Sequence, residues 1–284
     1  AMLNGSEVIF LPRFEVDMVI DQLPRATVMM GVPTHYTRLL ADLRLDADLT
    51  SGMRLFTSGS APMTASVHDE FERRTGHRIL ERYGMSETGM ITSNPYEGDR
   101  VAGTVGFALP GMDVRVCTGD GAEVEPGVTG IVEVRGPSVF AGYWNRPEKT
   151  AAEMRADGFF VTGDVGHLDR EGRLTLEGRS SDMIISGGYN VYPKEIELVL
   201  DQCEGVVESA VVGLPHLDFG EAVTAFLVTT SGVEVQPEAI DEALAGLARF
   251  KHPKRYVVIG ELPRNSKGKV QKSVLRDANA DLYA

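Results

Sequence analysis

The sequence has few of the features that mark secreted, membrane-spanning or disulfide-rich proteins. Its 284 residues include two cysteines, Cys117 and Cys203, which lie in separate segments without metal-ligand spacing. A disulfide framework is therefore not expected, and a reducing, cytoplasmic setting is the default expectation. No apolar run approaches the roughly 20 residues needed to span a bilayer. Residues 1–7 contain no basic stretch followed by an apolar one, so secretion is not expected either.

Positive charge is also scarce, because the net charge is −13. This balance argues against a general nucleic-acid-binding protein. The charge is unevenly spread, since residues 249–276 contain nine basic residues and one acidic residue, Glu261. This basic segment has two interpretations that the sequence leaves open. It is either a solvated face that balances acidic neighbours or a contact surface for a small polyanionic ligand.

The length exceeds that of most single domains, and the 43% hydrophobic content is ample for packed cores. The first third alternates strand and helix signals, with strands expected at 27–31 and 53–57 and helices at 33–45 and 64–75. Such alternation predicts a parallel sheet covered by helices. Residues 104–178 instead show short alternating runs between Gly, Pro and Asp turns, which predict a small antiparallel barrel or sheet.

Alternation of strands and helices returns after Arg179. Helices are expected at 193–201 and 237–248, and strands at 206–213 and 222–229. We therefore predict an α/β fold class with a domain boundary near Asp182. The expected domains are 1–181, made of an α/β portion (1–103) and a β-rich portion (104–181), and a small α+β domain at 182–284.

Four polar, glycine-rich segments interrupt this scaffold, and the first three each have a plain structural alternative. Residues 57–62 follow a strand, where glycine lets the backbone approach a ligand; the alternative, which these residues favour, is a simple turn. Residues 81–88 combine an aromatic, a glycine and a glutamate suited to a purine and Mg²⁺; the alternative is a strand-to-helix turn. Residues 159–164 end in a carboxylate suited to ribose hydroxyls, or in a turn aspartate. Residues 262–272 place Gly-Lys in a basic loop that is not a Walker A motif.

In this order the four segments resemble the adenylate-forming, AMP-binding superfamily, which includes the acyl- and aryl-CoA ligases. The resemblance implies an acid–CoA ligase that forms an acyl-adenylate from ATP and a carboxylate and then an acyl-CoA thioester, with Mg²⁺ as the metal and ATP/AMP and coenzyme A as ligands. Tyr83 would stack on adenine, Glu87 would hold Mg²⁺, and Thr88 would lie near the α-phosphate. Asp164 would bind the ribose with help from Arg179.

The resemblance assigns roles to further residues. Lys269 would be the catalytic lysine and Asp182 the hinge of the small domain. The other implied nucleotide contacts are Ser58, Gly59, Ser60 and Gly84. The implied coenzyme A contacts are Gly187, Gly188 and Tyr189. The implied acid-binding residues are His35, Arg82 and Met85. For Arg82 a structural ion pair with Glu81 or another acid is the alternative, and for His35 a packed core position.

Segments such as 76–88, 187–197 and 262–272 are similar to those of the malonyl-CoA synthetase subgroup. A short dicarboxylate, malonate or methylmalonate, would need a fixed cation for its distal carboxylate, and a guanidinium at Arg82 suits that role. Alternatives are an aryl- or other acyl-CoA ligase, or a non-catalytic nucleotide- or CoA-binding fragment. The family's phosphate loop is absent from these 284 residues, so the chain alone is expected to be inactive in adenylation.

Overall fold

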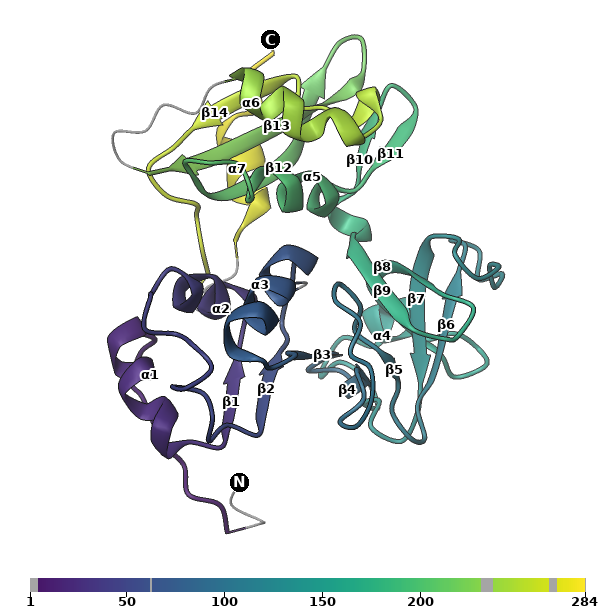
Figure 1. Cartoon of the computed structure of the whole chain (residues 1–284). Helices are drawn as coiled ribbons and strands as arrows, with labels where there is room; N and C mark the ends of the chain where they lie inside the picture. Colours follow the sequence, from purple (N-terminus) through teal and green to yellow (C-terminus); the bar gives the residue numbers. More distant parts are fainter. Residues whose placement is uncertain (1–4, 62, 231–236, 266–269, 284) are drawn as a thin grey trace. The chain divides into compact units, whose positions relative to one another are not determined.

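A computed structural model of the chain describes residues 5–61, 63–230, 237–265 and 270–283. The chain divides into two compact units (Figure 1). The first contains the chain up to Thr162 together with Gly166–Leu176. The second contains Gly163–Val165 and the chain from Glu177 onward. Each unit has its own hydrophobic core and is described by itself.

The first unit begins with a five-stranded mixed sheet in the order β1-β2-β3-β4-β5. Its strands are β1 (Val28–Gly31), β2 (Leu55–Ser58), β3 (Leu80–Met85), β4 (Gly89–Ser93) and β5 (Phe107–Ala108). Strands β1, β2 and β3 run parallel, and β4 and β5 are added antiparallel. The parallel part was expected from the alternation of strands and helices.

Three helices and a short 3₁₀ turn belong to the same part of the chain as this sheet. They are α1 (Val16–Gln22), the 3₁₀ turn Leu23–Arg25, α2 (Pro33–Leu40) and α3 (Ala65–Thr75). Their core includes Tyr36, Phe56 and Phe71, whose rings pack edge to face. Local signals explain helix α3. The Thr64 side chain accepts a hydrogen bond from the Val67 N–H at 3.2 Å, and the helix ends at a left-handed Gly76.

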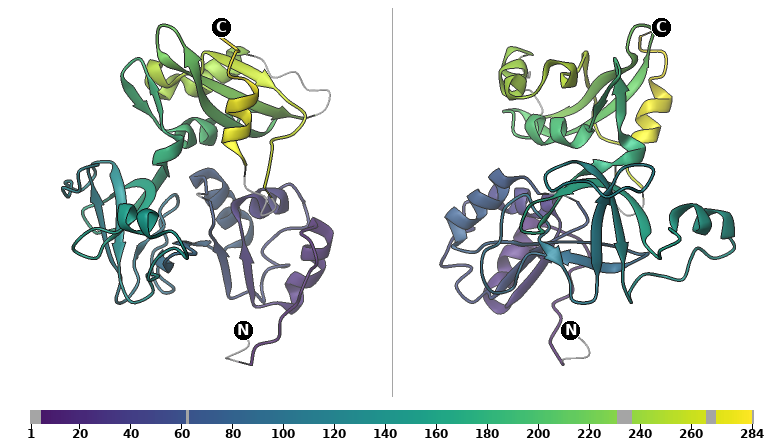
Figure 2. Two further views of the ribbon diagram at one scale, coloured as in Figure 1. Left: turned by 180° about the vertical axis from the view of Figure 1, so that it is seen from behind. Right: turned by 90° about the vertical axis from the view of Figure 1, so that its right-hand side faces the viewer.

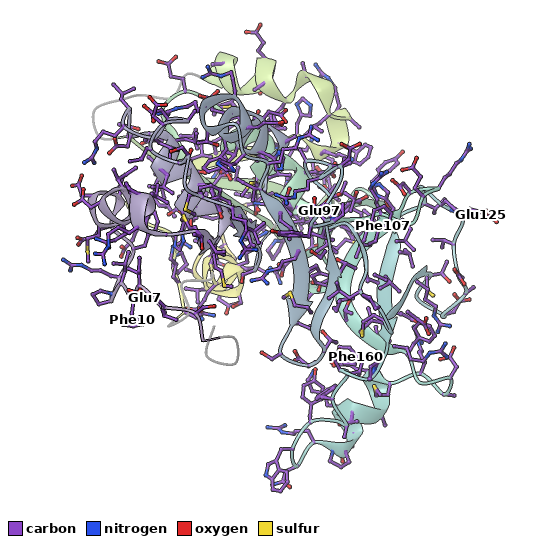
Figure 3. The ribbon with its side chains drawn as sticks, turned by 60° about the horizontal axis from the view of Figure 1, so that its bottom comes forward. Glu7, Phe10, Glu97, Phe107, Glu125 and Phe160 are labelled. Atoms are coloured by element: carbon purple, nitrogen blue, oxygen red, sulfur yellow. The ribbon has the colours of Figure 1, made fainter. Side chains whose placement is uncertain are left out.

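A four-stranded sheet in the order β6-β7-β8-β9 forms the β-rich portion. Its strands are β6 (Asp113–Cys117), β7 (Gly130–Arg135), β8 (Phe160–Leu168) and β9 (Leu174–Arg179), and helix α4 (Pro147–Glu153) lies between β7 and β8 in the chain. Phe160, labelled in Figure 3, packs edge to face on Phe140 with ring centroids 5.3 Å apart. This contact ties β8 to the segment that leads into α4.

The second unit is built on a sheet in the order β11-β10-β13-β12, with β14 paired to β13. Its elements are the 3₁₀ turn Ser180–Asp182, β10 (Ile184–Ser186), β11 (Tyr189–Val191), α5 (Pro193–Leu200), β12 (Val206–His216), β13 (Gly220–Thr229), α6 (Pro237–Ala243), the 3₁₀ turns Leu244–Gly246 and Arg249–Lys251, β14 (Arg255–Val258) and α7 (Lys272–Ala278). Alternate β12 residues face opposite cores: Val211 packs with Ile196 and Leu200 of α5, whereas Val212 packs with Leu275 of α7. Figure 2 shows α5 and α7 on opposite faces of this sheet.

Several element ends differ from the sequence-based expectations. The helix expected at 33–45 ends at Leu40, and that expected at 237–248 ends at Ala243 and continues as a 3₁₀ turn. The strands expected at 206–213 and 222–229 form one longer hairpin, β12–β13. The α/β fold class is confirmed. Of the two forms predicted for the β-rich portion, a barrel or a sheet, the structure has a sheet. Within the described ranges, no helix has the length and apolar character to cross a bilayer.

Candidate functional site

Several of the predicted site residues lie at the carboxyl edge of the parallel strands. Gly31 of β1 pairs with Ser58 of β2, and Ser58 is level with Glu81 of β3. The segments that follow these positions, including Gly59-Ser60 and Arg82, therefore lie at the same edge. Ligands of open α/β sheets bind at such an edge.

The segment after β2 carries unsatisfied polar groups. The hydroxyls of Thr57 and Ser58 are buried and have no hydrogen-bond partner among the described residues. Ser60 adopts φ of 69°, a left-handed conformation that is costly for a non-glycine residue. A Cβ atom on Gly59 would lie 3.3 Å from the carbonyl oxygen of Arg82, so this segment approaches β3 closely. Orphaned buried hydroxyls and backbone strain are typical of ligand sites.

Arg82 presents its guanidinium without a carboxylate partner in the described part of the chain. Its guanidinium instead contacts Met30 Sδ, at 4.0 Å. The neighbouring Glu81 carboxylate instead accepts a hydrogen bond from the Gly103 N–H at 3.2 Å. The alternative in which Arg82 pairs with Glu81 is therefore wrong, and Arg82 is left available for an anionic ligand.

His35 combines the two interpretations that the sequence left open. Its imidazole stacks on Phe14, with ring centroids 4.0 Å apart, so it is packed. It also lines an open hollow of about 390 Å³ beside Leu11, Met29 and Met30. Burial, and secondarily the charge of Arg38, lowers the pKa of His35, so the imidazole stays neutral at pH 7.

The segment 81–88 forms a hairpin between β3 and β4. Met85 pairs with Gly89, so Glu87 and Thr88 lie at the tip, and the strand-to-helix alternative is wrong. A Cβ atom on Gly84 would lie 2.3 Å from the carbonyl oxygen of Gly89, so only glycine fits. Tyr83 is 8% exposed and packs in the core of the β-rich portion, against which Met85 is partly buried. Thr88 is buried, and its hydroxyl donates to the Gly89 carbonyl at 3.1 Å.

The Glu87 carboxylate meets a tyrosine that the sequence analysis missed. The Tyr143 hydroxyl lies 3.2 Å from Glu87 Oε1 and 2.7 Å from Glu153 Oε2. Lys149 forms an ion pair with Glu153, four residues along α4. Burial, and then the two carboxylates, raise the pKa of Tyr143 to about 12. The Gly-Tyr-Trp turn before Pro147 was the available signal, but it does not reveal which residue the tyrosine reaches.

Glu87 suits a magnesium ion better than the other acidic group in the described residues. Mg²⁺ is usually held by one or two carboxylates together with substrate phosphates. Glu87 is half-buried and has no cationic partner within the described ranges, so its lone pairs are available. The group formed by His68, Asp69 and Glu72 on α3 also brings three potential ligands within 4.8 Å of one another. There Arg78 already binds Glu72 at 2.9 Å, which points to a structural role.

Asp164 and Arg179 come together as the motif order implies. The Arg179 Nε lies 2.9 Å from Asp164 Oδ1, and Asp164 is 7% exposed. The Ser180 hydroxyl donates to the carbonyl oxygen of Gly163 at 3.1 Å, which ties the two strands beside this pair. The ion pair fixes the orientation of the Asp164 carboxylate at this end of β8. Asp182 lies in the 3₁₀ turn that follows β9.

Gly187 and Gly188 form the two-residue turn of the β10–β11 hairpin. Their φ angles of 58° and 82° correspond to a type I′ turn, in which glycine is strongly favoured. Tyr189 follows directly and is exposed, and its ring stacks on Phe250 with centroids 4.5 Å apart. The turn therefore presents backbone and an aromatic ring on the same surface of the second unit.

The basic segment is partly explained by internal ion pairs. Lys251 lies 2.6 Å from Glu195, Lys272 lies 2.6 Å from Glu197, and Arg264 pairs with Glu208. For these three residues the charge-balancing interpretation holds. Lys269, the expected catalytic lysine, lies outside the described residues.

Comparisons with known proteins agree with this arrangement. Residues 1–144 match the family model described as AMP-binding enzyme, and residues 195–269 match the AMP-binding enzyme C-terminal domain. An indoleacetate–CoA ligase of Aromatoleum aromaticum is 38% identical over 97% of this chain and 55% of its own length. A malonate–CoA ligase of Arabidopsis thaliana is 38% identical over 95% of this chain and 49% of its own length.

Among solved structures, ATP-bound MatB from Rhodopseudomonas palustris superposes with a TM-score of 0.91 at 53% identity. That match covers 97% of this chain and 55% of MatB. The chain thus spans about half the length of the relatives it matches. Both units take part in the likeness, because almost the whole chain is aligned.

Proposed function

This chain belongs to the AMP-binding enzyme family, and from that premise we propose that it carries the later part of an acid–CoA ligase for malonate or methylmalonate. The observation that carries the proposal is the Arg82 guanidinium at the carboxyl edge of the parallel strands, which has no carboxylate partner among the described residues. An arginine grips a carboxylate through two parallel hydrogen bonds, which suits the distal carboxylate of a short dicarboxylate. The names of the malonate–CoA ligase and MatB relatives support this choice of acid.

The first half-reaction joins the acid to AMP. One substrate carboxylate attacks the α-phosphorus of ATP, and pyrophosphate leaves. The ribose of ATP would be held by Asp164 and Arg179, whose ion pair already fixes both side chains. Ser58, Gly59, Ser60 and Gly84 would line the nucleotide. Positioning and charge neutralisation account for most of the rate gain in such transfers.

The site's charges fit an anionic substrate. The residues around Glu87 suit Mg²⁺, which when bound supplies positive charge to the phosphates. The buried position of Tyr83 leaves little of its ring to stack on adenine, so its proposed contribution is limited to its exposed edge. Thr88 would act near the α-phosphate through the hairpin tip, and Lys269 would place an ammonium between the carboxylate and the phosphate. His35 and Met85 would border the acid.

The second half-reaction transfers the acyl group to coenzyme A. The thiol attacks the acyl carbon of the adenylate, the carbon–oxygen bond to the phosphate breaks, and AMP leaves. We propose that residues 182–284 form a mobile small domain that rotates about Asp182. The rotation would remove Lys269 from the acyl-adenylate and bring the Gly187-Gly188 turn to it. The left-handed glycines of that turn let the pantetheine arm approach the backbone, and Tyr189 flanks it.

The test is AMP release by the extended protein, meaning this chain preceded by its upstream coding sequence. It is assayed with ATP, Mg²⁺ and CoA against malonate, methylmalonate, acetate, benzoate and indoleacetate. We expect turnover with malonate or methylmalonate that Arg82→Leu lowers at least about tenfold, the cost of a lost bidentate charge contact of about 1.5–3 kcal/mol. Arg73→Leu, at an exposed arginine of α3, is the control and should have no effect.

The other outcomes discriminate between the alternatives. Turnover with benzoate or indoleacetate alone would retain the ligase and reject Arg82 as a carboxylate-binding residue. Nucleotide binding without turnover of any acid would favour a non-catalytic binding protein.

A further inference from the structure

The tip of the β3–β4 hairpin is covered by the segment that leads into α4. The N–H of Phe140 donates to the carbonyl oxygen of Glu87 at 2.7 Å. The N–H of Tyr143 donates to the Thr150 hydroxyl at 2.9 Å, which fixes the turn onto α4. The backbone next to Glu87 and next to Tyr143 is therefore fixed by hydrogen bonds. The contact between the two side chains follows from these backbone positions.

The Tyr143 hydroxyl stands between two carboxylates and has one proton to give. It lies 2.7 Å from Glu153 and 3.2 Å from Glu87, so Glu153 accepts the stronger hydrogen bond. Lys149 holds Glu153 in place through an ion pair, and its ammonium lies 4.1 Å from the centre of the Tyr143 ring. The hydroxyl can thus orient Glu87 without neutralising it.

We infer that Tyr143 is a positioning residue for Glu87, and that Glu153 and Lys149 hold the tyrosine so that Glu87 keeps its lone pairs for the cation that accompanies ATP. This inference rests on the proposed function. Groups that orient a metal-binding side chain in this way commonly change metal affinity 10–100-fold when removed.

The test compares ATP binding to the extended protein with and without Mn²⁺, by equilibrium titration and by the Mn²⁺ electron paramagnetic resonance signal. Tyr143→Phe removes only the hydroxyl. We expect the Kd for metal-free ATP to stay within about twofold, while the improvement that Mn²⁺ brings falls roughly tenfold. The matched control is Tyr96→Phe, which removes a hydroxyl bound to Arg54 in the same unit and should leave both values unchanged.

A second variant covers the case in which Tyr143→Phe fails to fold. Glu153→Gln keeps the shape of the side chain but removes the charge that pairs with Lys149, so Tyr143 is held less firmly and positions Glu87 less well. The Mn²⁺-dependent improvement should then fall, again without a change in metal-free binding.

Three results would contradict the inference. If Mn²⁺ improves ATP binding as much in the folded variants as in the parent protein, the tyrosine does not position Glu87. Equal loss of ATP binding with and without Mn²⁺ would indicate a general structural role instead. A parent protein whose ATP binding ignores Mn²⁺ would overturn the proposed function itself, and this inference with it.

Discussion

Glu81 offers a test of the site that does not depend on any substrate. Its carboxyl is 3% exposed on β3 and accepts hydrogen bonds from the backbone N–H groups of Gly103 and Met63. Burial raises the pKa of Glu81 to about 7, and the two N–H groups offset only part of that rise. Glu81→Gln replaces the protonated acid by a neutral group of the same shape.

The direction and size of the expected change in stability with pH follow from proton linkage. Because the pKa of Glu81 is higher in the folded chain than the ordinary 4.5, the folded state binds more protons between pH 4.5 and 7. The free energy of unfolding of the parent therefore falls as pH rises through this window. At 1.36 kcal/mol per pH unit, a rise of the pKa to about 7 corresponds to about 2–3 kcal/mol lost between pH 5 and 8. The glutamine variant should not show this loss.

The assay is denaturant-dependent hydrogen exchange of the β3 and β4 amides at pH 5, 6, 7 and 8, corrected for intrinsic exchange rates. The stability of Glu81→Gln relative to the parent should increase by about 2–3 kcal/mol across this range. Glu97→Gln, at an exposed glutamate labelled in Figure 3, is the control and should track the parent. Parallel curves for the parent and Glu81→Gln would refute a buried carboxyl with a raised pKa.

Three further predictions concern the two units. Lys269→Ala in the extended protein should abolish malonate-dependent pyrophosphate release yet spare thioester formation from supplied malonyl-adenylate; equal loss of both would reject the proposed roles. Gly84→Ala should destabilise the hairpin by roughly 1–3 kcal/mol in urea unfolding, because its Cβ would lie 2.3 Å from Gly89 O. Gly119→Ala, which meets nothing within 4 Å, is its control and should cost far less. Glu197→Ala should destabilise the second unit by roughly 3–5 kcal/mol, since two lysines lose their buried partner; calorimetry would detect it.

Elements with local start and stop signals were predictable from the sequence. Helix α3 carries both signals within its own segment, since Thr64 caps its first turn and the left-handed Gly76 ends it. Helix α2 ends earlier than its apolar pattern suggested for a reason that is not local. Arg74 of α3 donates hydrogen bonds to the carbonyl oxygens of Leu40, Asp42 and Leu45, at 2.5–2.7 Å. These contacts satisfy carbonyls that a longer helix would have used.

The candidate site was predictable to a similar degree. The resemblance placed Asp164 and Arg179 at one ligand, and the structure brings the two side chains together in an ion pair. Two features depend on packing between distant segments and left no local signal. Tyr143 reaches Glu87 across 56 positions of the chain, and the ring of Tyr83 is buried by strands that follow it. The roles of Arg82, Glu87 and Lys269 stay predictions until they are measured.

The most direct test of the central claim is the product formed from malonate, ATP and CoA by the extended protein in the presence of Mg²⁺. We expect malonyl-CoA and AMP in equal amounts by mass spectrometry, with pyrophosphate as the second phosphate product. ADP and phosphate in place of AMP and pyrophosphate, or no thioester from any acid of the panel, would contradict it.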